Sequence, residues 1–106
     1  MKVELLYIRD CPSHLPTVET LREALRESGI TLDISEIEIS NPAQAAKLLF
    51  LGSPTVRVDG KDVEPGVFEP KHFGVSCRSY LVNGKRQGTP DPEWIRKAIR
   101  GEHERQ

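Results

Sequence analysis

The chain of 106 residues has little net charge, no long apolar run and only two cysteines. No stretch approaches the roughly 18 consecutive apolar residues that a membrane-spanning helix needs. The N-terminus, MKVELL, is too short and too acidic for a secretory signal, so we expect a cytoplasmic protein with no membrane partner. The 15 basic and 16 acidic side chains leave a formal charge of -1, which gives no support for a nucleic-acid partner. The length predicts one domain over residues 1–100, followed by a polar tail over 101–106.

The two cysteines are Cys11 and Cys77. In a cytosolic chain, so few cysteines are more often reactive or free than joined in a structural bridge. The position three residues after Cys11, where a dithiol motif carries its second cysteine, holds His14. Dithiol exchange within that loop is therefore excluded, and Cys77 is the only candidate for a resolving thiol.

Hydrophobic periodicity predicts strands that alternate with helices. The expected strands cover residues 3–9, 31–39, 55–58 and 61–63, with a further extended piece over 76–82; the expected helices begin at Pro12, Pro42 and Pro92. Early alternation implies a parallel strand pair, and the Asp59–Gly60 turn adds an antiparallel strand. The predicted fold class is α/β: a mixed sheet of about four strands flanked by three helices, with an insertion over 65–88 before the last helix.

Cys11 lies where the first strand pattern gives way to the first helical pattern. A sulfur at the start of a helix is near unpaired N–H groups and the positive end of the helix dipole, which favour the thiolate. If the helix begins at Pro12, Pro16 removes a hydrogen bond and bends it. If it begins near Pro16, Cys11 loses part of the dipole contact. We prefer the start at Pro12.

The Cys11–Pro12 run, the FLGSPT segment over residues 50–55, the Asp59–Gly60 turn and Ser76-Cys77-Arg78 carry a resemblance to a known family. With this order of elements, the chain resembles the thioredoxin-like superfamily. Within it, the chain is most similar to small bacterial DF family (seleno)proteins, some of which are labelled alkylmercury-lyase-like. The resemblance implies that Pro54 is cis, faces Cys11 and lines a peptide-binding groove.

The expected substrate site lies around Cys11 and contains Pro12, Ser53, Pro54 and Thr55. A tight turn at Pro54 would leave the adjoining backbone free to pair with a ligand.

The function we expect is that of a thiol-dependent redox protein, of thiol-disulfide oxidoreductase type, with Cys11 as nucleophile and Cys77 as a possible resolving thiol. His14 either stabilises the thiolate and moves protons or is an ordinary solvated side chain. Cys77 is alternatively a buried structural cysteine on a strand. The expected partner is a protein or small-molecule thiol or disulfide, and we expect neither a cofactor nor a metal and assign no oligomeric state.

Two alternatives remain open. One is a non-catalytic module that binds a partner through the Pro54 groove. The other handles a soft metal or an organomercurial through Cys11 and Cys77. In that case His14 and His72 are further ligands, or Asp10 is an acid that protonates the leaving carbon.

The later half of the chain is locally basic, through Arg57, Lys61, Arg78, Lys85 and Arg86. Such charges are usually solvated, and we expect that here. Trp94 is expected to anchor the last helix to the core.

Overall fold

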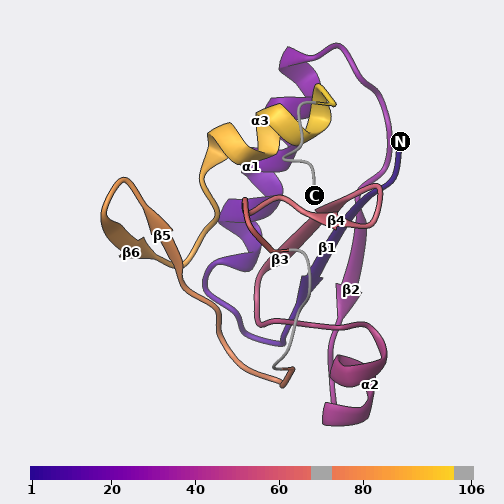
Figure 1. Ribbon diagram of the computed structural model, residues 1–106. Coiled ribbons are helices and arrows are strands. Elements are labelled where there is room, and N and C mark those ends of the chain that lie inside the picture. Colours follow the sequence, from indigo (N-terminus) through magenta and orange to yellow (C-terminus); the bar gives the residue numbers. More distant parts are fainter. Residues whose placement is uncertain (68–72, 102–106) are drawn as a thin grey trace.

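A four-stranded mixed sheet and three helices form the body of the protein in a computed structural model that describes residues 1–67 and 73–101 (Figure 1). The strands are β1 (Val3–Tyr7), β2 (Ser35–Glu38), β3 (Thr55–Val58), β4 (Lys61–Asp62), β5 (Tyr80–Val82) and β6 (Lys85–Gln87). The helices are α1 (His14–Glu27), α2 (Pro42–Lys47) and α3 (Pro92–Ile99). The sheet order is β2-β1-β3-β4, with β1 parallel to β2 and β3 antiparallel to both β1 and β4. The α/β class, the parallel pair and the antiparallel hairpin are thus as predicted.

Alternation along β1 and β3 gives the sheet two apolar faces. Val3, Leu5, Val56 and Val58 pack in one cluster with α1 and α3, which lie side by side over this face (Figure 1). A smaller cluster on Leu6 includes Ile39, Ala45 and Phe50 from the α2 region. Trp94 packs against the larger cluster, as expected of an anchor for α3.

The first helix begins at His14, not at Pro12, so the preferred start is wrong. Pro16 is then the third helical residue, within the first turn, whose N–H groups have no partner inside the helix. Its ring therefore removes no hydrogen bond and gives no reason for a bend. Cys11 lies three residues before the helix, which weakens the dipole contact expected for its sulfur.

Local signals predicted the starts of α2 and α3 and the β3–β4 hairpin correctly. The Asn41 side chain accepts a hydrogen bond from Gln44 N at 2.8 Å, and the Asp91 side chain accepts one from Glu93 N at 2.9 Å. Asp59–Gly60 and Asn83–Gly84 both have positive φ at the two turn positions, as a two-residue hairpin turn requires.

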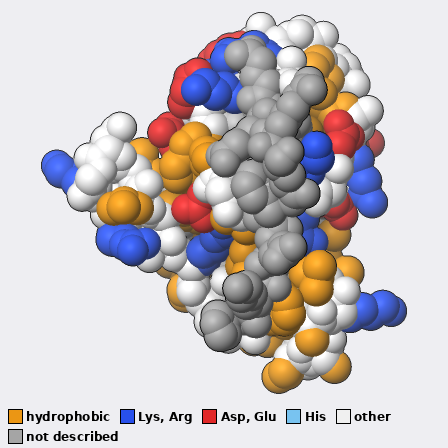
Figure 2. Space-filling view, viewed as in Figure 1, with side chains coloured by type: hydrophobic (Ala, Val, Ile, Leu, Met, Phe, Trp, Pro, Cys, Tyr) orange, Lys and Arg blue, Asp and Glu red, His pale blue; other side chains and the backbone are white. Residues whose placement is uncertain are grey.

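The second strand is shorter than predicted, because only Ser35–Glu38 pairs with β1. Leu32 and Ile34 nevertheless pack against the larger cluster. The predicted insertion contains β5 and β6, which form a separate two-stranded sheet. Figure 2 shows this hairpin projecting from the body with basic side chains on it. Of the expected polar tail, only Gly101 is among the described residues. Across residues 1–67 and 73–101, no helix has the length and apolar character needed to cross a membrane.

Candidate functional site

Ser53, at the Ser53–Pro54 cis peptide bond, joins two segments that are far apart in the sequence. On one side its Oγ accepts a hydrogen bond from Ile8 N at 3.1 Å. On the other side its backbone N–H donates to Ser76 O at 2.8 Å and its carbonyl accepts from Arg78 N at 2.9 Å. Ser53 and Cys77 are therefore paired in an isolated parallel bridge. We call this pairing the Ser53 rung.

The Ser53 rung overturns the expectation that the backbone beside Pro54 is free for a ligand. Both polar backbone groups of Ser53 are bonded to the chain's own residues 76–78. Ser53, Pro54 and Thr55 are buried, whereas Pro12 is exposed. The cis geometry of the Ser53–Pro54 bond itself is as expected.

Cys11 lies in the turn that follows β1 and is partly buried. Its N–H donates to Ile8 O at 3.3 Å, and its carbonyl accepts from His14 N at 3.2 Å. Ile8 thus bonds to Cys11 through its carbonyl and to Ser53 Oγ through its N–H. In this way Ile8 links the turn that contains Cys11 to the segment that contains the cis proline.

Cys77 is an exposed, free cysteine. Neighbouring strands are about 4.8 Å apart, so the backbone of Cys77 lies next to that of Ser53. Adjacent residues of an extended segment point to opposite sides. The exposed Cys77 and the buried side chain of Arg78 fit this alternation. Cys77 is therefore not the buried structural cysteine of the alternative reading.

The side chain of Arg78 is the most extensively bonded polar group described near the site. It is 7% exposed, and its Nη1 donates to Asp62 Oδ2 at 2.7 Å and to Thr55 Oγ1 at 3.1 Å. Its Nη2 donates to Asp62 Oδ1 at 3.2 Å and to Glu64 Oε1 at 2.7 Å. The guanidinium carbon also lies 4.4 Å from the centre of the Tyr80 ring, a cation–π contact. We call these partners, Thr55, Asp62, Glu64 and Tyr80, the Arg78 cage.

This burial corrects the expectation that the basic residues of the later half are solvated. Lys61, Lys85 and Arg86 are exposed, but Arg57 is partly buried and Arg78 is enclosed. Burial lowers the pKa of Arg57, whose Nη2 donates to Leu49 O at 2.8 Å. Burial alone would also lower the pKa of Arg78, but the surrounding Tyr80, Asp62 and Glu64 reverse the direction and raise it. Arg78 therefore remains a cation.

Tyr80 connects the Arg78 cage to the cis proline. It is fully buried, and its hydroxyl donates to Pro54 O. Burial raises the pKa of this hydroxyl; Arg78 opposes the rise, while Asp62, Glu64 and Cys11 add to it. The phenol therefore stays neutral and remains a hydrogen-bond donor. The ring also lies 6.1 Å from that of Trp94 on α3.

At two glycines near the site, neighbouring atoms are so close that an added side chain would overlap them. A Cβ on Gly52, which has φ +129°, would lie 2.8 Å from Arg78 Cβ and 3.2 Å from Cys77 O. A Cβ on Gly88 would overlap Ser13 Oγ, at the start of α1. The segment before β5 therefore packs against Gly52, close to Pro54. The segment after β6 packs against Ser13, close to Cys11.

The imidazole of His14 is directed to other partners. It stacks on Tyr7 with ring centres 3.8 Å apart, and its Nε2 is 2.7 Å from Glu36 Oε1. The bond between His14 and Cys11 is a backbone one. Because this Nε2 pairs with Glu36 on β2, a structural role for His14 is favoured over a role in proton transfer.

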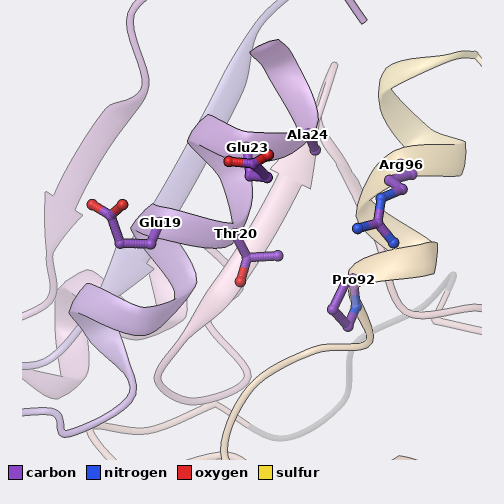
Figure 3. Close-up of a pocket in the computed structure, with 6 residues that line it drawn as sticks. All are labelled: Glu19, Thr20, Glu23, Ala24, Pro92 and Arg96. Carbon is purple, nitrogen blue, oxygen red and sulfur yellow. The ribbon is translucent and has the colours of Figure 1, made fainter. Parts of the chain in front are cut away.

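Among residues 1–67 and 73–101, neither a metal-binding cluster nor the pocket between the helices adds to this site. Within the two described ranges, no three His, Cys, Asp or Glu side chains come together as a metal site, and His72 lies outside those ranges. Asp10 is exposed, with φ +61°. A pocket of about 320 Å³ lies between α1 and α3, lined by Glu19, Thr20, Glu23, Ala24, Pro92 and Arg96 (Figure 3). It belongs to the helical layer and contains none of the residues around Cys11.

The fold and site define a small α/β protein with a cysteine in the turn after β1 and a cis proline before β3. A family described as "Domain of unknown function (DUF2703)" matches residues 13–99, and the chain belongs to this family. The matched residues include Cys77 and Arg78 and begin just after Cys11. No curated protein and no solved structure matches the chain significantly.

Two residues of the candidate site were not predicted from the sequence: Arg78 in its buried state and Tyr80. The hydrophobic pattern around Tyr80 indicated only an extended piece. The signal that could have found Arg78 is the acidic pair Asp62 and Glu64, which follows the predictable Asp59–Gly60 hairpin.

Proposed function

We propose that this chain is a thiol-disulfide exchange protein with Cys11 as nucleophile and Cys77 as resolving thiol. One observation carries the proposal: both cysteines flank the same Ser53–Pro54 segment. Cys77 is paired with Ser53 in the bridge, and Cys11 lies in the turn whose Ile8 N–H is bound by Ser53 Oγ.

A thioredoxin-like fold is part of this proposal. It is supported by the sheet order β2-β1-β3-β4, by the alternation of β1, α1, β2 and α2, and by a cis proline immediately before β3. The β5–β6 hairpin is then an addition before α3. DF family membership is proposed on the same residues that carry the resemblance, including Cys77 and Arg78.

The exchange proceeds in two balanced steps. The Cys11 thiolate attacks a small-molecule disulfide, forms a mixed disulfide and releases one thiolate. The Cys77 thiolate then attacks Cys11 Sγ, which releases the second thiolate and leaves a Cys11–Cys77 bridge. The two electrons and the two protons end on the small molecule, which leaves as two thiols.

The groove-binding alternative is less well supported. An extended partner needs free backbone groups to pair with at Pro54, and the Ser53 rung already uses them. Soft-metal binding would require both thiolates to turn toward one ion, and it predicts protection of both cysteines by that ion.

Mass measurement tests the proposal. Treatment with oxidised glutathione should convert the wild-type protein to a form lighter by two hydrogens, reversible by a dithiol. Cys77→Ser should accumulate a glutathione adduct on Cys11, and Cys11→Ser, the matched control, should react much more slowly. If Cys77→Ser forms no adduct under conditions that modify an ordinary exposed thiol, Cys11 is not the nucleophile and the proposal is wrong.

A further inference from the structure

Residues 76–78 approach the site without regular secondary structure of their own. Two backbone hydrogen bonds to Ser53 form a single rung, and β5 begins only at Tyr80. One rung is a weak restraint, because fixing each residue costs about 1–2 kcal/mol of conformational free energy. A second contact must hold this segment if Cys77 is to keep one position.

The Arg78 cage supplies that contact from the residue next to Cys77. The guanidinium donates two bonds to Asp62 and one to Glu64, so it is fixed to β4 and to the residues that follow it. It also donates to Thr55 Oγ1, which in turn donates to Gly52 O at 2.6 Å. The cage therefore connects the Cys77 segment to both ends of the turn that contains Pro54.

The guanidinium also lies over the ring of Tyr80, two residues further along. Because the Tyr80 hydroxyl donates to Pro54 O, the cage restrains the chain on both sides of Arg78. Gly52 leaves the space in which Arg78 Cβ and Cys77 O lie. The Arg78 cage and the close approach at Gly52 thus together restrain the backbone at residues 77 and 78.

We propose that Arg78 is the positioning residue of the site: its cage holds Cys77 at the Ser53 rung as the built-in exchange partner of Cys11. This inference rests on the proposed thiol exchange and assigns Arg78 no contact with the reacting atoms. The planar guanidinium group is needed, because Asp62 and Glu64 are bound by two different nitrogens of it. The single ammonium of lysine cannot make the same set of bonds.

The effective concentration of Cys77 toward Cys11 measures this role. It is obtained from the equilibrium in which the glutathione mixed disulfide converts to the bridged protein and releases one reduced glutathione, measured at set concentrations of reduced glutathione. Arg78→Lys should lower it by about tenfold or more, since the segment then samples many positions. Arg96→Lys is the matched control, because Arg96 also pairs with two carboxylates, Glu27 and Glu93, but on the far helical layer. It should leave the effective concentration unchanged.

Two further measurements separate positioning from a general loss of structure. In a Cys77→Ser background, Arg78→Lys should not change the rate at which Cys11 reacts with oxidised glutathione. Amide exchange at residues 53 and 78 should accelerate in Arg78→Lys while exchange in β1 does not. If Arg78→Lys does not fold, Asp62→Asn, which keeps the arginine and weakens its two-bond contact, replaces it and should also lower the effective concentration.

The outcomes are distinct. A bridge that forms equally well in Arg78→Lys and wild type overturns the positioning role and leaves the proposed function intact. Failure of Cys11 to react with glutathione in the Cys77→Ser background overturns the proposed function itself. A selective loss of bridge formation, with the Cys11 rate preserved, supports both.

Discussion

Breaking the Arg78 cage should cost far more stability than breaking a surface ion pair. In Arg78→Met the methylene packing is largely kept but all four donated bonds are lost. Asp62, only 6% exposed, is then left as a buried carboxylate without its cation. Removing one partner of a buried pair typically costs about 3–5 kcal/mol, a large share of the roughly 5–15 kcal/mol that stabilises a domain.

The cost should be asymmetric between the two partners. Asp62→Ala leaves Arg78 bonded to Glu64 and Thr55, so we expect only about 2 kcal/mol, the scale of one lost charged hydrogen-bonding partner. The double variant no longer contains the unpaired Asp62 and should therefore be less destabilised than Arg78→Met alone. The coupling energy is then at least about 2 kcal/mol, towards the upper end of the usual range for contacting residues.

Urea unfolding followed by far-UV circular dichroism measures all three variants against wild type. Arg96→Met is the control, because the side chains of Arg96 and Glu27 are 37% and 46% exposed and such a pair contributes about 0–1 kcal/mol. If Arg78→Met costs no more than Arg96→Met, or if the two single costs simply add, the cage does not hold the segment as described.

Other changes test the remaining parts of the structure. Tyr80→Phe leaves Pro54 O without its buried donor and should cost about 1–3 kcal/mol in urea unfolding. Because burial raises the folded-state pKa of Tyr80, the unfolded chain loses this proton first above pH about 10. Wild-type stability should then fall by up to about 1.4 kcal/mol per pH unit more steeply than that of Tyr80→Phe, and parallel pH profiles would contradict this. Gly52→Ala should cost about 1–3 kcal/mol and speed amide exchange at residue 78, since its Cβ meets Arg78 Cβ at 2.8 Å with φ +129°. Asn41→Ala removes the cap of the short helix α2 and should cost about 1 kcal/mol in the same unfolding assay, with no change in Cys11 reactivity.

Local chemistry made most of the fold predictable from the sequence. Asn41, Asp91 and the Asp59–Gly60 pair act on residues within four positions of themselves, so a sequence window contains the whole cause. The start of α1 was misplaced because Pro12 and Pro16 both satisfy first-turn rules. The choice depends on two backbone hydrogen bonds, from Cys11 N to Ile8 O and from His14 N to Cys11 O. They form turns before the helix, which therefore begins at His14. The limits of β2 depend on where β1 ends, which is a property of the pair and not of either strand.

The site was predictable in its residues but not in its arrangement. Cys11, Ser53, Pro54 and Cys77 are candidates from the sequence alone, yet the Ser53 rung that joins two of them is a single pairing with no periodic pattern to reveal it. The burial of Arg78 depends on Asp62 and Glu64, 16 and 14 residues away. A charged residue is ordinarily expected at the surface, and only the tertiary structure supplies the carboxylates that make the exception stable.

A buried ion pair is an inefficient way to hold a loop, because desolvating the charges offsets much of their attraction. Apolar residues at positions 62 and 78 would fix the segment to the sheet at least as firmly. What the guanidinium fork adds is direction, since its bonds go to three separate acceptors, Asp62, Glu64 and Thr55, and so restrict the orientation of residue 78. The residue whose orientation is thereby set is its neighbour, Cys77. A fold that needed only a closed loop would gain nothing from this arrangement, whereas one that must present a thiol at the Ser53–Pro54 segment would.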